Sequence, residues 1–277
     1  MAGNNQSAVN KKWYKHVFKQ IQPIHIGAGS YGVINETRIF ISGWTMWGAL
    51  TKAYNLKKGV SLSENQKLFE HISCFYPCFD EEGRNVLFPK FENGEFVLGN
   101  YSEDNFRAKF VDTFISTAID SKTNTALDES LHEINVILPG AKVDLYEGNV
   151  KEKQLYWVGV VQLKDKQEND LPSEIYVGGE VKYGLGKMEC INKNYSMEIL
   201  SGEWKAQDRI LKNYLPVKRK ESYFSGKVEL LVEIDNAWER ERLQVKLRDG
   251  NGFFYLPGTK VNKLSDWDNG IKKGIYY

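Results

Sequence analysis

Two glycine-rich segments carry the residues of this chain that could do chemistry. The first, HIGAGSYG, begins at His25, and the second, VGGEVKYGLGKMEC, begins at Val177. Glycine lets a bulky backbone approach closely and leaves amide N–H groups exposed, which suits phosphate groups. The glycines with this predicted role are Gly27, Gly29, Gly178, Gly179, Gly184 and Gly186. The pattern predicts binding of a polyanion, with RNA as the leading candidate.

Basic and aromatic side chains accompany the glycine segments. Lys182 and Lys187 bracket the second loop and could neutralise phosphates. A helix that begins after Gly43 would bring its positive amino-terminal end nearby. The aromatic residues that could stack on unpaired bases are Tyr31, Trp44, Trp47 and Tyr183. Such stacking contributes about 1–3 kcal/mol per base, although we expect at least one of the two tryptophans to pack in the core.

Histidine and cysteine side chains give weaker hypotheses. His25 stands beside a glycine turn and could act as a general acid or base, but a histidine at a strand end is more often structural or a ligand contact. Cys74 and Cys78, with His71 close by, lack the second ligand pair of a zinc site. We therefore expect no catalytic residue, no metal and no cofactor, and thiols that stay reduced.

Local patterns place these residues on an α+β framework. We expect strands over residues 13–26, 37–41, 154–163, 227–234, 242–247 and 252–257, and a hairpin turn at 92–94. Helices are expected over 44–55, capped by Ser42, and over 62–71, capped by Ser63. Because strands outnumber helices, the expected fold class is α+β.

Composition restricts the class of protein further. The 277 residues suffice for one large domain or two small ones, and the formal net charge is only +1. Without a global basic field, nucleic acid would have to bind in a local groove. The first twelve residues lack the apolar run of a signal peptide or a membrane anchor, and no later run is long enough to span a membrane. We expect a cytoplasmic protein with a disordered tail over residues 1–12.

Three segments resemble, in the same order, the RAMP superfamily of CRISPR effector subunits. PIHIGAG and IFISGWTMWGALTKAY resemble its first strand, its glycine turn and its I-P-G-S-S-L-K-G-A-L-R-like helix start. Gly43, Gly48, Ala49 and Leu50 match that start, and Lys52 stands near a position that is usually basic. STAIDSKTNTALDESLHEINVILPGAKVDLY resembles the a-I-D-x-x-T-x-x-A segment, and VGGEVKYGLGKM resembles the glycine-rich loop.

This resemblance implies a fold and a domain organisation. It implies a ferredoxin-like or RRM-like core with an antiparallel sheet, an inserted hairpin and glycine-rich loops, with two such halves as an option. The RAMP domain would cover residues 13–195, with an insertion at about 56–118, and a β-rich half or elaboration would cover 196–277. RNA held along such a sheet would contact the glycine segments and their aromatic neighbours.

The resemblance also implies a function inside a type III CRISPR effector complex. The middle region is similar to that of subunits that cap the repeat-derived handle of the guide RNA, which gives our leading hypothesis. In that arrangement the first glycine region, with His25 and Lys52, meets the handle, while Lys122 and Asn124 wedge against the guide. The implied partners are the guide RNA, a large polymerase/cyclase-like subunit, backbone subunits and, as a further candidate, target RNA.

Three alternatives stay open beside this non-catalytic subunit. One is a repeated backbone subunit; those resemble one another in a loop aspartate, whereas the corresponding loop here has Glu36. Another is a metal-free CRISPR-RNA-processing endoribonuclease that uses His25. In those enzymes the glycine loop lies close to the carboxyl terminus, whereas a long segment follows it here. The third is a carbohydrate-binding β-protein whose tryptophans line a cleft, with Trp13, Trp157, Trp204, Trp238 and Trp267 as candidates.

Overall fold

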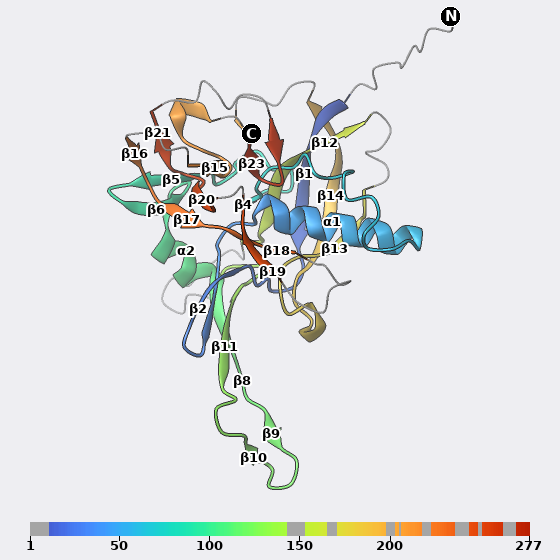
Figure 1. The fold of residues 1–277 in the computed structure, drawn as a ribbon, viewed down its shortest axis with the longest axis vertical. Coiled ribbons are helices and arrows are strands. Elements are labelled where there is room, and N and C mark those ends of the chain that lie inside the picture. The colour runs from blue at the N-terminus through green and yellow to red at the C-terminus, as the bar shows by residue number, and fades with distance from the viewer. Residues whose placement is uncertain are drawn as a thin grey trace, which may run out of the picture.

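An antiparallel sheet crossed by a long helix forms the centre of the protein (Figure 1). The computed structural model describes residues 11–142, 153–164, 171–197, 203–204, 206–217, 223–235, 244–248, 251–262 and 270–277. The strands of the central sheet are β1 (Lys11–Gln20), β4 (Tyr76–Cys78), β12 (Tyr156–Lys164), β13 (Glu174–Tyr176) and β14 (Lys187–Met197). They lie in the order β13-β14-β1-β12-β4, and all paired neighbours are antiparallel.

This strand order is that of a ferredoxin-like sheet. Helix α1 (Gly43–Lys58) connects β1 to β4, and β12 lies between these two strands in space. Strand β14 then pairs with the free edge of β1, as the last strand of such a fold does. The described residues between β12 and β14 contain β13, the second glycine segment and one 3₁₀ turn, η2 (Val181–Tyr183). The α+β class and its ferredoxin-like core are confirmed.

Strand β1 is the middle of this sheet and is buried through most of its length. Val17 and Phe18 are fully buried, which shows that both faces of the strand are covered. The strand ends at Gln20 rather than at residue 26, because Pro23 supplies no N–H for a ladder. Ile24 still forms a single antiparallel bridge with Ile137. Strand β12 agrees closely with the range 154–163 that its run of apolar residues predicted.

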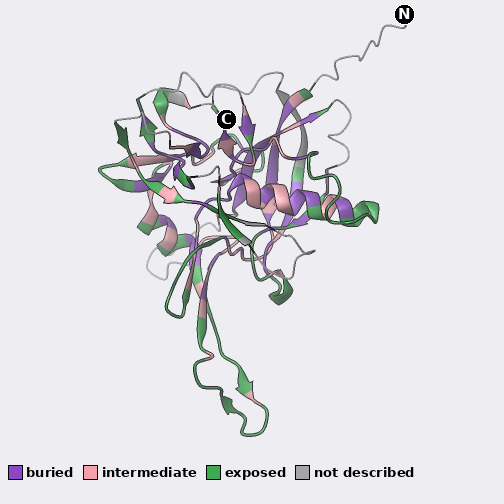
Figure 2. Ribbon diagram, in the orientation of Figure 1, coloured by how far each residue is buried: buried purple, intermediate pink, exposed green. Residues whose placement is uncertain are grey.

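Helix α1 packs one side against the sheet (Figure 2). Met46 and Leu50, four residues apart, are fully buried, and burial of such side chains contributes about 1.5–3 kcal/mol each. The helix ends at Gly59, whose φ of 67° allows the left-handed termination that glycine favours. The Ser42 hydroxyl bonds to the Thr45 hydroxyl at 2.8 Å instead of to a helix amide, so the predicted side-chain cap is wrong.

The second predicted helix, over residues 62–71, is also wrong. Residues 62–68 form successive turns, and Asn65 has a φ of 53°. The buried side chain of Asn55 donates to the carbonyl oxygens of Leu62 and Glu64, at 3.4 and 2.7 Å. The indole N–H of Trp47 donates to Gln66 O at 2.7 Å. These side chains bind backbone carbonyls that a helix would have used for itself.

The first glycine segment is a strand and not a turn. Strand β2 (Gly27–Tyr31) pairs with β3 (Ile34–Thr37) in a hairpin that turns at Gly32 and Val33. The strand predicted over residues 37–41 is therefore displaced toward the amino terminus. The Thr37 hydroxyl accepts the N–H of Ile26 at 2.9 Å and closes the base of the hairpin. Ile41 forms only a bridge to Phe75 within the described residues.

A long hairpin extends from the body next to β2 and β3 (Figure 1). Its strands are β8 (Val111–Ser116), β9 (Ile119–Asp120), β10 (Thr125–Ala126) and β11 (His132–Ile137). Strand β11 pairs with β8 and, in parallel, with β3, which gives a sheet of order β2-β3-β11-β8. The outer part of the hairpin is exposed (Figure 2). Helix α2 (Glu103–Phe110), which we did not predict, precedes it, and the Ser102 hydroxyl accepts Asn105 N at its start.

The predicted hairpin at residues 92–94 is confirmed. Strands β5 (Pro89–Glu92) and β6 (Glu95–Leu98) flank Asn93 and Gly94, and β7 (Tyr101–Ser102) pairs with β6. Both turn residues have positive φ, 51° and 85°. Asn-Gly is the sequence that such a two-residue turn prefers, because both positions need a left-handed backbone.

The carboxyl-terminal part consists of short strands that pack on the core. They are β15 (Leu215–Pro216), β16 (Phe224–Ser225), β17 (Val228–Leu230), β18 (Val232–Asp235), β19 (Gln244–Leu247), β20 (Phe253–Tyr255), β21 (Lys260–Val261), β22 (Ile271–Lys272) and β23 (Ile275–Tyr276). A 3₁₀ turn, η3 (Gln207–Arg209), precedes them. The predicted strand over 227–234 is divided between β17 and β18. In the described residues these strands form small sheets of two or three, not a second ferredoxin-like sheet.

Side chains from both parts of the chain share one hydrophobic core. Trp204, Tyr214 and Phe254 belong to the same cluster as Phe18 and Leu50. The division near residue 195 remains a prediction about how the chain is organised. In the described part of the chain, no helix is long and apolar enough to cross a membrane.

Candidate nucleic-acid interface

The two glycine segments, far apart in the sequence, are hydrogen-bonded to each other. Gly179 N donates to His25 O at 2.9 Å, and Gly186 N donates to Pro23 O at 2.8 Å. Both bonds join the second segment to the residues just before β2. The fold therefore brings the two segments together.

Gly178 shows how closely the two segments approach. A Cβ atom at this position would collide with His25 O, and its φ of 85° is a conformation that other residues rarely adopt. Gly184 has a similar φ of 83°, but a Cβ there would have open space among the described residues. Glycine is needed at position 178 so that the two glycine segments can touch, and at position 184 because of the left-handed backbone conformation.

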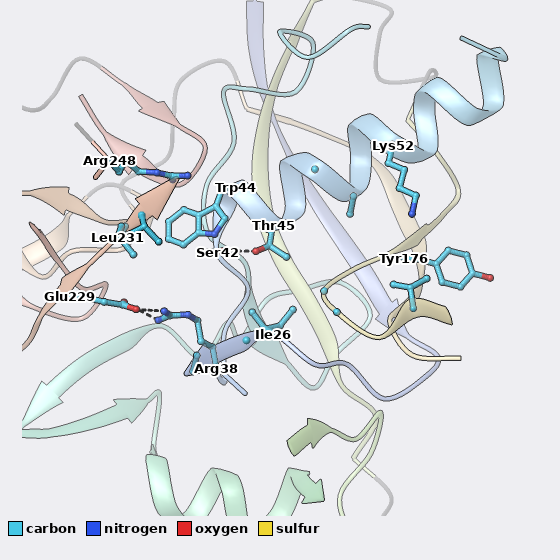
Figure 3. A pocket seen from close by; sticks show the side chains of 18 of the residues that line it. Ile26, Arg38, Ser42, Trp44, Thr45, Lys52, Tyr176, Glu229, Leu231 and Arg248 are labelled. Carbon is cyan, nitrogen blue, oxygen red and sulfur yellow. Dashed lines mark hydrogen bonds and ion pairs between the residues drawn. The ribbon is translucent and has the colours of Figure 1, made fainter. Parts of the chain in front are cut away.

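A pocket of about 600 Å³ lies between these segments, α1 and the strands β17 and β18. We call it the glycine pocket. Gly27, Gly178 and Gly179 line it from the glycine segments, and Ser42, Thr45 and Lys52 line it from the start and the outer face of α1. In Figure 3 Lys52 and Tyr176 lie at one end of the pocket, and Arg38 and Glu229 at the other.

Arg38 and Glu229 form an ion pair at the inner end of the glycine pocket. Both guanidinium NH₂ groups of Arg38 bond to the Glu229 carboxylate, and Nη1 also donates to the Tyr214 hydroxyl at 3.3 Å. The side chains are 14% and 23% exposed, so the pair is shielded from water. Burial opposes the charge on Arg38, but Tyr214 and Glu229 outweigh that effect and raise the guanidinium pKa. The pair joins the amino-terminal half of the pocket to the carboxyl-terminal half.

Trp44 lines the glycine pocket, but its ring already packs on neighbours from the carboxyl-terminal part of the chain. One side of its ring packs on Tyr214, with centroids 4.8 Å apart. The Arg248 guanidinium carbon lies 4.8 Å from the ring centroid, and Arg248 Nε is 3.0 Å from the Glu233 carboxylate. Trp47 packs partly against the core and has Lys273 Nζ 3.6 Å from its ring centroid. Both tryptophans are therefore held by neighbours of the same chain.

Gly43 is buried against the backbone of the carboxyl-terminal part of the chain. A Cβ atom there would collide with the backbone of Gly274 in the turn between β22 and β23. Its lack of a side chain serves the contact between α1 and the carboxyl-terminal hairpin, which corrects the predicted RNA contact at this residue. The pocket surface of α1 begins with Ser42, Trp44 and Thr45 instead.

Three exposed tyrosines lie on the segments that form the glycine pocket, and one of them, Tyr176, lines the pocket itself. Tyr31 on β2 is 70% exposed, Tyr183 in η2 is 82% exposed, and Tyr176 at the end of β13 is 40% exposed. Gly29 lies under the Tyr31 ring, because a Cβ there would be 3.6 Å from that ring. Tyrosine rings at this exposure can stack on unpaired bases. Tyr176 is the stacking candidate that the sequence analysis missed.

The predicted lysines differ in what they contact. Lys52 lines the glycine pocket, and Lys182 is exposed in η2. Lys187 Nζ is instead 2.8 Å from the Glu174 carboxylate, which raises the pKa of Lys187. Lys122 and Asn124 lie in the loop between β9 and β10, at the far end of the long hairpin (Figure 1). That loop is not brought to the glycine pocket.

His25 is fixed by the backbone of the long hairpin. Its Nδ1 is 2.8 Å from Asn135 O, so the Nδ1–H group donates to that carbonyl oxygen. A Cβ on Gly179 would lie 3.2 Å from its Cδ2, so the ring packs against the second glycine segment. This arrangement places the His25 ring between the long hairpin and the second glycine segment.

Among the described residues, neither the cysteines and histidine weighed for a metal centre nor the tryptophans weighed for a sugar cleft form such a site. In the described part of the chain, no group of three histidine, cysteine or acidic side chains could hold a metal ion. Burial raises the pKa of the Cys74 thiol to about 12. Trp13, Trp157 and Trp204 are all buried, so they do not line a cleft. Trp238 and Trp267 lie outside the described residues.

Comparisons with known proteins support the fold. No family model matches the chain, and no curated protein matches it. A chain in the cryo-EM structure of the Type III-B Cmr-beta bound to cognate target RNA and AMPPnP matches with a TM-score of 0.56 and 16% identity, over 90% of this chain and 86% of that one. A chain of the Cmr-beta structure bound to cognate target RNA gives a TM-score of 0.55 at the same identity and coverage. The fold implied by the RAMP resemblance is thereby confirmed.

Proposed function

We propose that this chain is a guide-RNA-binding subunit of a type III CRISPR effector complex. The shared fold with chains of RNA-bound Type III-B Cmr-beta supports the class. The observation that carries the proposal is the glycine pocket, where both glycine segments, the start of α1 and Lys52 meet. A surface lined by glycines lets a sugar-phosphate backbone approach closely, Lys52 can neutralise a phosphate, and Tyr176 at the outer end can stack on an unpaired base.

Within such a complex, we assign the chain to the repeat-derived handle of the guide. The similarity of its middle region to handle-capping subunits favours this role over that of a repeated backbone subunit. The glycine pocket would hold the handle, and the long hairpin, with Lys122 and Asn124 at its tip, would contact the guide farther along. The partners are then the guide RNA and neighbouring effector subunits. Sequencing the RNA that copurifies with the protein tests the role, because RNAs held through a spacer-derived part instead of a common repeat-derived end would contradict it.

Replacing Lys52 by glutamate should weaken binding of single-stranded RNA about 5- to 10-fold near 0.1 M salt, because one phosphate contact becomes a repulsion. The slope of log affinity against log salt should fall by about 1. Fluorescence anisotropy with a labelled repeat-derived RNA measures both quantities. Lys57→Glu is the matched control, since it makes the same charge change on the same helix outside the pocket. Equal losses for the two variants would reject the glycine pocket as the RNA site.

We further propose that the chain binds RNA without cutting it. The Nδ1 of His25 is bonded to a backbone carbonyl, and Gly27 and Gly179 flank the ring, so these three neighbours supply no second proton-transfer group. General acid–base cleavage needs one group to take a proton and another to give one. RNA incubated with the wild-type protein should stay full length on a denaturing gel. Cleavage that disappears in His25→Ala would establish the endoribonuclease alternative.

A further inference from the structure

A second pocket, of about 610 Å³, lies among the strands β15, β18, β22 and β23 and meets the glycine pocket. We call it the carboxyl-terminal pocket. Arg248 lines both pockets, and its guanidinium carbon lies 4.8 Å from the centroid of the Trp44 ring (Figure 3). Arg248 Nε is 3.0 Å from the carboxylate of Glu233, which also lines the carboxyl-terminal pocket. The two pockets are therefore neighbours that share one cationic side chain.

Two lysines also line the carboxyl-terminal pocket, and they differ in what they contact. Lys272 Nζ is 3.0 Å from the Glu70 carboxylate. Lys273 forms no ion pair with the described residues, and its Nζ lies 3.6 Å from the centroid of the Trp47 ring instead. A ring covers one side of an ammonium group, which has three N–H donors, so Lys273 can still bind an anion. Burial lowers the pKa of Lys273 and so does the charge of Arg248, and a bound anion would stabilise its charged form.

Most of the remaining lining is apolar or aromatic. Its members of this kind are Pro216, Val217, Ile275, Tyr276 and Tyr277. The Tyr277 side chain is 46% exposed. Its hydroxyl is 3.4 Å from Nδ1 of His71, and the two rings are tilted by 52° with centroids 6.1 Å apart, so His71 does not lie flat on the Tyr277 ring. A tyrosine ring with this exposure can stack on an unpaired base.

We propose that the carboxyl-terminal pocket holds one nucleotide of the RNA strand that the glycine pocket binds. Lys273 binds the phosphate of this nucleotide, and the Tyr277 ring stacks on its base. A nucleotide joins an anionic phosphate to a flat aromatic base, and the pocket joins cationic side chains to apolar and aromatic ones. Because the pockets meet at Arg248, a strand that leaves one can enter the other. The inference rests on the proposed RNA binding at the glycine pocket.

The first test reverses the charge at Lys273 in the full chain. Lys273→Glu should weaken binding of a labelled repeat-derived RNA about 5- to 10-fold near 0.1 M salt, because one phosphate contact becomes a repulsion. The slope of log affinity against log salt should fall by about 1. Lys57→Glu makes the same charge change outside both pockets and should bind nearly as the wild type does. Lys273 has a φ of 50°, which asparagine tolerates, so Lys273→Asn replaces the variant if urea unfolding shows that Lys273→Glu has not folded.

The second test removes the ring of Tyr277. Tyr277→Ala should weaken binding of the same RNA about 5-fold or more, because a stacked base loses its partner. Tyr277→Phe keeps the ring and should lose much less affinity. Equal losses in the two variants would assign the effect to the hydroxyl group and would overturn the stacking role.

The outcomes separate this inference from the proposed function. Larger losses for Lys273→Glu and Tyr277→Ala than for Lys57→Glu support it, whereas losses no larger than that control would reflect overall charge and overturn it. Wild-type affinity in both pocket variants, with weakened binding by Lys52→Glu, would overturn the inference and leave the glycine pocket as the RNA site. Wild-type affinity in Lys52→Glu as well would overturn both.

A titration with AMP distinguishes a strand from a free nucleotide. If the two pocket variants lose affinity for AMP and keep their affinity for RNA, the carboxyl-terminal pocket serves a free nucleotide, and the inference is overturned. If they lose affinity for RNA, the strand passes through this pocket as we infer.

Discussion

Gly178→Ala is expected to destabilise the protein by about 2–5 kcal/mol and to abolish RNA binding. Its Cβ would collide with His25 O, so the two glycine segments would have to separate. The left-handed backbone at this position, with φ of 85°, adds a cost of its own. Since domains are stable by only about 5–15 kcal/mol, a loss of this size should be plain in urea unfolding. RNA affinity should be measured at a temperature where the variant is still folded.

Gly184→Ala is the matched control for this result. Its φ of 83° gives the same backbone strain, but its Cβ meets open space among the described residues. We expect a loss of about 1–2 kcal/mol and nearly normal RNA affinity. The difference between the two variants isolates the contact with His25. If Gly178→Ala binds RNA as well as Gly184→Ala does, the joined glycine segments are not the binding surface.

Glu229→Gln should lower stability and raise RNA affinity at the same time. The change leaves the guanidinium of Arg38, only 14% exposed, without its carboxylate. Removing the Glu229 carboxylate leaves the Arg38 guanidinium charged and poorly solvated. We therefore expect a loss of about 2–4 kcal/mol in the free energy of unfolding. It also removes a negative charge from the glycine pocket, so the folded protein should bind single-stranded RNA roughly 2- to 5-fold more tightly.

The exposed pair of Glu82 and Arg84 provides the comparison for this variant. These side chains are 50% and 74% exposed, and Glu82→Gln should cost no more than about 1 kcal/mol and leave RNA affinity unchanged. Urea unfolding and anisotropy titrations on the three proteins measure both effects. Weaker RNA binding by Glu229→Gln, after correction for the folded fraction, would show that the RNA does not pass this end of the pocket.

Local signals in the sequence were sufficient for part of the fold. The apolar run of β12, the Asn93-Gly94 turn and the periodic apolar residues of α1 each specify their element within a few positions. The prediction of a helix over residues 62–71 was wrong because the side chains of Asn55 and Trp47 hold that segment in turns. These contacts depend on the position of α1, so the sequence of residues 62–71 alone does not indicate them. Strand β2 was hidden because GAGSY lacks the β-branched residues typical of strands.

The candidate site was only partly visible for a related reason. The glycine-rich sequence identified both segments, but the hydrogen bonds between them appear only in the folded chain. The pairing of Arg38 with Glu229 joins residues 191 positions apart, so only the folded chain reveals it. The same holds for Gly43, whose neighbour Gly274 comes from the last hairpin. The carboxyl-terminal strands, for which no motif was found, supply the wall that covers Trp44 and closes the glycine pocket.

The most direct test of the central claim is to crosslink RNA to the protein purified from its native host and to map the attachment sites by mass spectrometry. If RNA passes through the glycine pocket, crosslinks should fall on Tyr176, Tyr183 and the Lys52 region of α1, and the attached RNAs should share a repeat-derived end. Crosslinks confined to elements outside the glycine pocket, such as β16 and β21, or the absence of copurifying RNA, would contradict this claim.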